Sequence, residues 1–181
     1  MIFGNLITAH VGKTIDYPNS PWYAVTVTPE DLKYKIHRHV FGEKSKWDFG
    51  KILPNTCLKN LSEFLYENNF DFNQIKQKIQ YDDNFDYEVL KNGIIQIQGY
   101  YEKLKQYQNI EDANFPWCFI AHKQEGPYMI TDGTHRQVAS YIYHFLDPGR
   151  ESFVSQIAYC AIQLIKTEND FGRIPDHFCM D

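Results

Sequence analysis

The chain contains 181 residues, of which 43% are apolar and 16% aromatic, and its formal net charge is −5. This length and apolar content suit a single folded domain with a sizeable core, and they argue against a disordered chain. The acidic balance argues against a surface that grips duplex DNA, because contacts with phosphates require an excess of basic side chains. Nucleic acid is therefore not an expected partner.

Targeting features are weak in this sequence. No apolar run reaches the ~20 residues that cross a bilayer, and the N-terminal segment MIFGNLITAHVGKT lacks the charged and apolar regions of a signal peptide. The four cysteines, Cys57, Cys118, Cys160 and Cys179, are scattered without a C-x-x-C pair, which is typical of reduced, packed thiols. We expect a cytoplasmic protein with no membrane partner.

The N-terminal part contains a clear junction between a strand and a helix. Residues 1–21 carry glycine and proline breakers and are expected to be irregular. The β-branched and aromatic run WYAVTV, 22–27, predicts a strand. Directly after it, Thr28, Pro29 and Asp31 have the pattern of an N-cap, a first helical residue and a capping-box partner.

A helical block follows a polar loop that is expected over 37–51. The first predicted helix places three leucines on one face, Leu58, Leu61 and Leu65. A second helix is predicted after a capping Asp71. Asn92-Gly93 predicts the end of a short third helix, and the segment beyond it leaves strand and helix open.

The last third has a different character. Segments 116–122 and 127–131 are typical of strands and flank the short loop KQEG, as in a hairpin. A helix is predicted after Thr134, because apolar residues recur at helical spacing as far as Leu146. A final strand is expected over 156–165. Together these elements predict an α+β fold.

The segment YMITDGTHRQVASYIYHF gathers Asp, Gly, Thr, His and Arg at 132–136, just where this helix begins. The first N–H groups of a helix have no partner within the helix, and the helix dipole makes that end positive. Gly133 lets a ligand approach the backbone closely, and Thr134, His135 and Arg136 add hydrogen-bond donors. This combination predicts an anion site, and phosphate is the commonest such anion.

Asp132 repels phosphate and needs a separate explanation. Its carboxylate could hold the loop by accepting backbone N–H bonds, pair with Arg136, or bind a metal that bridges to the phosphate. A simpler interpretation also stays open, in which Asp132 and Gly133 form only a turn and a cap. His135 and Arg136 would then lie on a solvated face.

The segment YMITDGTHRQVASY resembles the signature of the ParB/sulfiredoxin superfamily, and the strand 22–27 with its helix start resembles the beginning of ParB-like domains. The resemblance implies a ParB/sulfiredoxin-like mixed sheet with helices, in a single domain over 1–181. The core would comprise 22–36 and 115–166, and 37–114 would be a mainly helical insertion. In sulfiredoxins, free-serine kinases and CTP-using partition proteins, this motif binds nucleotide phosphates.

Two departures narrow what the resemblance implies. Sulfiredoxins carry a catalytic cysteine within the motif, where this chain has Thr134, so sulfinic-acid repair is not expected. Partition proteins add helix-turn-helix and dimerisation domains, for which no residues remain here. The free-serine kinase branch keeps Asp-Gly at the turn, as this chain does, and a further branch carries Asp-Gly-Gln-His-Arg.

The resemblance implies phosphotransfer from a nucleotide, as in a kinase, or nucleotide hydrolysis, with a small molecule or a protein as acceptor. Gly133–Arg136 would hold the phosphates of ATP or another nucleotide, and Mg²⁺ would offset their charge. Asp132 and Glu30 are the candidate catalytic residues. Glu30 follows the first strand, where it could accept the proton of an attacking hydroxyl. A capping and dipole role for Glu30 and Asp31 stays open.

The alternative is a non-catalytic module that senses a nucleotide, or that associates with nucleic acid in a mobile-element or defence system. The sequence identifies no set of metal ligands at a recognisable spacing. It also leaves open whether the protein is an enzyme at all.

Overall fold

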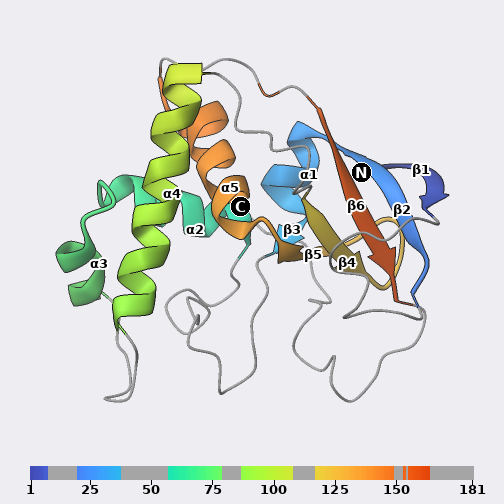
Figure 1. Cartoon of the computed structure of the whole chain (residues 1–181), viewed down its shortest axis with the longest axis horizontal. Coiled ribbons are helices and arrows are strands. Elements are labelled where there is room, and N and C mark those ends of the chain that lie inside the picture. The colour runs from blue at the N-terminus through green and yellow to red at the C-terminus, as the bar shows by residue number, and fades with distance from the viewer. Residues whose placement is uncertain are drawn as a thin grey trace. The chain divides into compact units, whose positions relative to one another are not determined.

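The computed structural model describes residues 1–7, 20–37, 57–78, 87–107, 117–148, 153 and 155–163. These residues form an α+β fold with a mixed six-stranded sheet and five α-helices, as the sequence predicts at this level (Figure 1). Contacts divide the chain into two compact units. The sheet unit comprises 1–39, 111–134 and 153–181, and the helical unit comprises 40–110 and 135–152.

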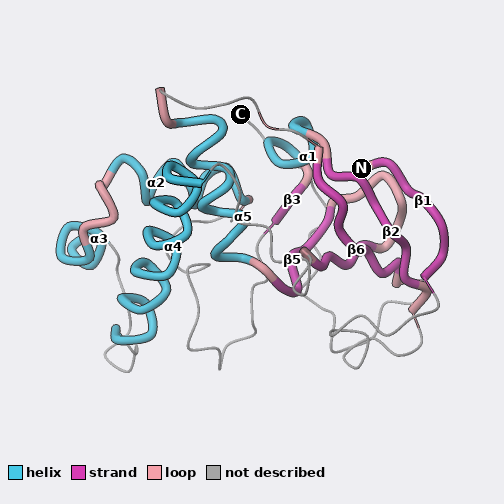
Figure 2. The backbone as a smooth tube through the Cα atoms, turned by 45° about the horizontal axis from the view of Figure 1, so that its top comes forward, coloured by secondary structure: helices cyan, strands magenta, loops and turns pink. Residues whose placement is uncertain are grey.

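The sheet unit contains all six strands in the order β1-β2-β6-β4-β5-β3 (Figure 2). The strands are β1 (Ile2–Ile7), β2 (Trp22–Val27), β3 (Ile36–His37), β4 (Cys118–Ala121), β5 (Tyr128–Asp132) and β6 (Gln156–Ile162). The pairs β4–β6 and β3–β5 are parallel, and the other neighbours are antiparallel. It follows that β2, β3 and β5 run in one direction, so their carboxyl ends lie at the same edge of the sheet.

The central part of the sheet is buried on both faces. Paired residues face the same side of a sheet. One face carries apolar side chains that are at most 2% exposed, namely Val25, Val27, Phe119, Tyr128, Ile130 and Cys160. The opposite face carries the cluster of Trp22, Cys118, Ile120, Met129 and Ala161. The buried central strands therefore position the turns that follow them.

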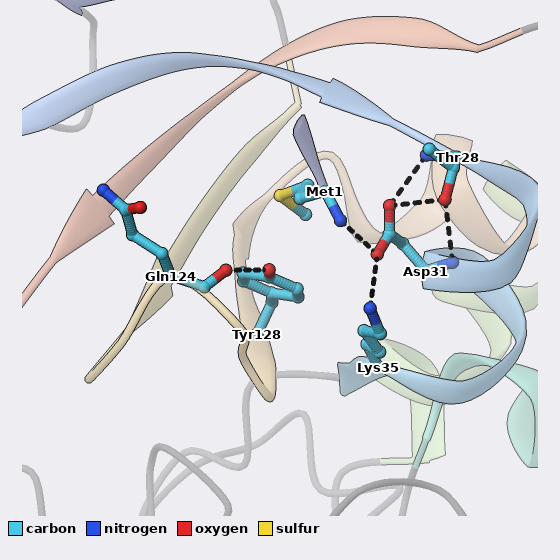
Figure 3. Close-up of polar contacts among 6 residues, drawn as sticks. All are labelled: Met1, Thr28, Asp31, Lys35, Gln124 and Tyr128. Carbon is cyan, nitrogen blue, oxygen red and sulfur yellow. Dashed lines mark hydrogen bonds and ion pairs between the residues drawn. The ribbon is translucent and has the colours of Figure 1, made fainter. Parts of the chain in front are cut away.

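Helix α1 (Pro29–Tyr34) connects β2 to β3 in the sheet unit. Thr28 caps it, Pro29 is its first residue, and Asp31 completes a capping box, as predicted. The hairpin between β4 and β5 is also confirmed. In that hairpin the Tyr128 hydroxyl donates a hydrogen bond to the carbonyl oxygen of Gln124, which ties the loop to the strand that follows (Figure 3).

The helical unit contains α2 (Leu58–Glu67), α3 (Phe72–Lys78), α4 (Tyr87–Tyr107) and most of α5 (Thr134–Tyr141), which continues as the π-helical turn η2 (Ile142–Leu146). The predicted leucine stripe of α2 is confirmed, since Leu58, Leu61 and Leu65 are fully buried. Asp71 caps α3, because its Oδ1 accepts hydrogen bonds from the N–H groups of Asn73 and Gln74 at 2.8 and 3.1 Å. η2 contacts both α2 and α4.

Two predictions about secondary structure are wrong. Residues 2–7 form β1 rather than an irregular segment, because they pair with β2 over its whole length. Gly4 permits this pairing, since an added Cβ would lie only 3.1 Å from the Ala24 carbonyl oxygen. The second error is the helix end at Asn92-Gly93, which α4 passes through without interruption.

The reason for the continuity of α4 is its buried stripe, formed by Leu90, Ile94, Ile97, Tyr101 and Leu104. Burying five large side chains outweighs the cost of one helical glycine, which is about 1 kcal/mol.

The loop after β3 and the cysteines lie only partly within the described residues. The polar loop expected from residue 37 begins one residue later at the earliest, because His37 belongs to β3, and 38–51 lie outside the described residues. Cys57, Cys118 and Cys160 are buried free thiols, as predicted, and Cys179 lies outside the described part of the chain. Among the described helices, none is long and apolar enough to cross a membrane.

Candidate functional site

The turn between β5 and α5 has the geometry that the DGTHR motif predicts. Gly133 lies between strand and helix with φ of 85°, a conformation that favours glycine. Its N–H donates a hydrogen bond to Asp132 Oδ1 at 2.7 Å. The Asp132 carboxylate therefore holds the turn, which is the first of the three roles expected for it.

A β-bulge lies directly before this turn. Cys118 is opposite Asp132, whereas Phe119 is opposite Ile130, so Thr131 is an extra residue on β5. Bulges bend a strand and redirect the side chains beside them, and they are frequent next to active sites. The Thr131 hydroxyl oxygen is buried and accepts or donates no hydrogen bond within the described part of the chain. The bulge sets the direction in which Asp132 leaves the sheet.

The strand register places two further side chains beside Asp132. Asp132 pairs with Cys118 on β4, and Cys118 pairs with Tyr159 on β6. Cys118 is buried, whereas Tyr159 is half-buried. Sequence reasoning missed Thr131 and Tyr159 as neighbours of the motif. No local signal could have revealed them, because a bulge and a register depend on the partner strand.

Helix α5 carries the remaining residues of the motif. It begins at Thr134, and the chain passes from the sheet unit to the helical unit between Thr134 and His135. Thr134 and His135 are half-buried, and Arg136 is only 9% exposed. A guanidinium that is so deeply placed contributes to the folded structure as well as to any ligand site, and experiments on Arg136 must separate the two.

Asp31 is the centre of a network at the start of α1, and it is fully buried (Figure 3). Its Oδ2 accepts hydrogen bonds from the Thr28 N–H at 2.9 Å and from the Thr28 hydroxyl at 2.7 Å. Its Oδ1 accepts a hydrogen bond from the α-ammonium of Met1 and lies 3.4 Å from Lys35 Nζ.

These contacts determine the charge state of Asp31. Burial raises the pKa of its carboxyl, but the hydrogen bonds from Met1 and Thr28 outweigh burial, so the pKa lies below its ordinary value. Both carboxylate oxygens already have partners within the protein. Asp31 therefore has the capping role that the sequence left open, and Glu30 remains the candidate base at this helix start.

Glu30 is exposed in the first turn of α1. This helix starts at the carboxyl end of β2, and Asp132 lies at the carboxyl end of β5, so the topology brings both to the same edge of the sheet. β6 and β4 lie between these strands, which separates β2 from β5 by about three interstrand spacings, ~14 Å. The register also places Asp132 level with Ala24, before the end of β2 at Val27, so the strand ends lie further apart than this lateral spacing. The structure brings Asp132, Gly133 and Thr134 together and sets Glu30 apart from them along one edge.

Metal ligands are not clustered in this part of the chain. Among the described residues, no group of three or more His, Cys, Asp or Glu side chains is arranged to hold a metal ion. Mg²⁺ bound to a nucleotide does not require such a group, since one or two carboxylates and the phosphates supply its ligands. Asp132 is the carboxylate that the motif offers for this purpose.

Comparisons with known proteins give no relative from which a function could be inferred, so a functional assignment depends on the local geometry. No protein-family model matches the chain, and neither a curated protein nor a solved structure gives a match.

Proposed function

We propose that this chain is a ParB/sulfiredoxin-like protein that binds ATP or another nucleotide at Asp132–Arg136 and transfers or hydrolyses its terminal phosphate. The observation that carries the proposal is the turn itself. Gly133 has a left-handed conformation between β5 and α5, and Asp132 accepts the Gly133 N–H. A strand, a glycine turn and a helix start together form a common phosphate site, because helix N–H groups and the dipole favour an anion there.

Each residue of the motif has a chemical role in this proposal. Gly133 lets a phosphate oxygen reach the backbone, since no Cβ stands in the way. The Thr134 hydroxyl, the His135 imidazole and the Arg136 guanidinium donate hydrogen bonds to phosphate oxygens. Asp132 keeps the turn in shape and contributes a ligand to Mg²⁺, which offsets the charge of the phosphates when it is bound.

Glu30 is the proposed general base for the acceptor hydroxyl. Its carboxylate is exposed, so an acceptor molecule can reach it. The lateral spacing of ~14 Å between β2 and β5 means that no single phosphate touches both Glu30 and the turn. For Glu30 to take the proton of the acceptor hydroxyl, a nucleotide held at the turn would have to extend along this end of the sheet, so that its terminal phosphate and the acceptor both lie beside Glu30.

The fold is compatible with this assignment. The mixed sheet has a strand-to-helix connection at each of the two places where ParB-like domains are expected to have one, at β2–α1 and at β5–α5. Both connections lie at the edge where β2 and β5 end, and ligands of open α/β sheets commonly bind at the carboxyl ends of strands.

A nucleotide sensor without catalysis is the second candidate. The separation between Glu30 and the turn favours it, because a catalytic base must come within hydrogen-bond reach of the proton it takes. A sensor needs only the phosphate site and uses Glu30, if at all, as a favourable charge at the start of α1.

Nucleotide binding is tested by thermal unfolding of the protein with ATP, ADP, CTP and GTP, each with and without Mg²⁺. A ligand at about 100 times its dissociation constant stabilises the folded state by about 2.7 kcal/mol, which raises the melting temperature of a chain of this length by about 5 to 10 °C. No shift with any of these nucleotides would refute the proposed function.

Three variants locate the site. Thr134→Val removes one phosphate donor and preserves the shape of the side chain, so it should reduce the ligand-induced shift. Thr28→Val makes the same change at the start of α1 and should leave that shift intact. Arg136→Ala should abolish the shift, measured against the melting temperature of the same variant without ligand. A shift that all three variants retain would place the nucleotide elsewhere.

Turnover separates the two candidates. If the protein is an enzyme, the Glu30→Gln variant should retain the nucleotide-induced rise in melting temperature but should no longer release phosphate or form product. If it is a sensor, Glu30→Gln changes neither. The measurement is phosphate release from the nucleotide that gives the largest thermal shift, compared between wild type and Glu30→Gln.

A further inference from the structure

Tyr159 lies between the turn and β2, in a row of paired residues that starts at Asp132. Asp132 pairs with Cys118 on β4, and Cys118 pairs with Tyr159 on β6. Tyr159 in turn pairs with Ala24 on β2. Paired residues face the same side of a sheet, so these four side chains share one face. Tyr159 therefore supplies the only hydroxyl group of this row.

The apolar part and the polar end of the Tyr159 side chain have different surroundings. The residue is half-buried, and it packs against the apolar cluster that contains Trp22 and Cys118. Its hydroxyl makes no hydrogen bond within the described part of the chain. A tyrosine in such a place has its apolar body covered by the protein, while its hydroxyl can still donate a hydrogen bond to a ligand.

The distance between Asp132 and Tyr159 suits a chain of phosphates. β4 lies between their strands, which separates the two backbones by two interstrand spacings, ~10 Å. One phosphate bound at the turn does not span this distance, whereas a triphosphate is longer and a tyrosine hydroxyl lies at the end of a long side chain. The path from the turn to Glu30 also crosses β4 and β6, because Glu30 follows the end of β2. A nucleotide that extends from the turn toward Glu30 therefore brings its terminal phosphate close to Tyr159.

We propose that the Tyr159 hydroxyl donates a hydrogen bond to the terminal phosphate of a nucleoside triphosphate at this turn, an inference that rests on the proposed function. Gly133–Arg136 hold the phosphates that a diphosphate and a triphosphate share, and Tyr159 contacts only the third. The site thus distinguishes the two nucleotides, because a hydrogen bond to a charged oxygen is stronger than one to a neutral group. Removal of the terminal phosphate then weakens the binding of the product.

Tyr23 on β2 provides the matched control. It is half-buried, as Tyr159 is, and it lies on the neighbouring strand. Tyr23 pairs with Cys160 and therefore lies on the opposite face of the sheet from Tyr159. Its ring packs edge-on against Phe3, with the ring centroids 5.6 Å apart. Removal of its hydroxyl is the same chemical change on the face that does not carry Asp132.

The test measures dissociation constants by titration calorimetry, with Mg²⁺, for the nucleoside triphosphate that gives the largest thermal shift and for its diphosphate. Tyr159→Phe removes the hydroxyl and keeps the ring. It should weaken binding of the triphosphate about tenfold and binding of the diphosphate less than about twofold. Tyr23→Phe should change neither dissociation constant. The melting temperature of each variant without ligand shows whether its fold is intact.

Two results would overturn this inference and leave the proposed function standing. In the first, Tyr159→Phe binds the triphosphate as tightly as the wild type does. In the second, it loses affinity equally for the triphosphate and the diphosphate, which would place Tyr159 against the part of the nucleotide that both share. A wild-type protein that binds no nucleotide would refute the proposed function, and this inference with it.

Discussion

The chain begins a helix at the carboxyl end of a strand twice in the sheet unit, and it completes the two helix starts differently. At β2–α1, the side chains of Thr28 and Asp31 bond to each other's backbone N–H groups. At β5–α5, the residue before the helix is Gly133, which has no side chain, and the carboxylate of Asp132 accepts the Gly133 N–H instead.

The difference gives the start of α1 a structural role, whereas the start of α5 is the one that we propose as a ligand site. Thr28, Met1 and Lys35 already bind the buried carboxylate of Asp31, so a ligand at the start of α1 would have to displace these hydrogen bonds and ion pairs. At α5 the residue before the helix is a glycine, so no Cβ lies between the backbone and the phosphate that we propose there.

Asp31→Asn should have the largest effect on stability. The substitution removes a buried charge and leaves Met1 and Lys35 without it, which typically costs about 3 kcal/mol or more. The pKa of Asp31 is lower in the folded protein than in the unfolded chain. Its contribution is therefore complete above the unfolded pKa, and it is lost as the pH falls through the folded pKa.

Denaturant unfolding of wild type and Asp31→Asn at several pH values measures this effect. The difference in the free energy of unfolding should be constant near neutral pH and should shrink at acidic pH. A difference that grows on acidification would mean that the carboxyl is not held in its charged form.

Gly133→Ala should follow, with a loss of about 1 to 2 kcal/mol, because an alanine at φ of 85° is strained. The matched control is Gly99→Ala in the middle of α4, where an added Cβ meets no atom within 4 Å. This control should stabilise the protein by about 0.5 to 1 kcal/mol. If both variants unfold alike in denaturant, the left-handed turn is not a requirement of the fold.

The two threonines give the sharpest form of the contrast. Thr28→Val removes an N-cap and should cost about 1 kcal/mol, whereas Thr134→Val should cost less than about 0.5 kcal/mol, because Thr134 is the first residue of α5 and not its cap. Unfolding of both variants without ligand measures the difference. Equal losses in the free energy of unfolding would show that both helix starts depend on side-chain capping. The starts of α1 and α5 would then not differ in this respect.

Glu30→Gln should have the smallest effect on stability, a loss of less than about 0.5 kcal/mol from the weaker interaction with the dipole of α1. It stands next to Asp31 in the sequence, but it is exposed where Asp31 is buried. Denaturant unfolding at neutral pH provides the comparison. A loss as large as that of Asp31→Asn would assign Glu30 to the same network and would argue against its role as a base.

Features that depend on neighbouring residues could be predicted from the amino-acid sequence. Thr28, Pro29 and Asp31 predicted the start of α1, and the leucines of α2 predicted its buried face, because caps and helical stripes are formed by residues within a few positions of one another. The strand before Gly133, the turn and the helix after it were predicted from neighbouring residues in the same way.

Features that depend on distant residues could not be predicted, because they follow from contacts made in the folded chain. β1 is a strand because it pairs with β2, and α4 continues through Gly93 because its stripe is buried; both outcomes override local breakers. The bulge at Thr131 and the lateral spacing of ~14 Å between β2 and β5 arise from register and strand order, which are set by contacts across the sheet. The chain thus encodes its candidate phosphate turn locally, and the sheet determines which side chains lie beside it.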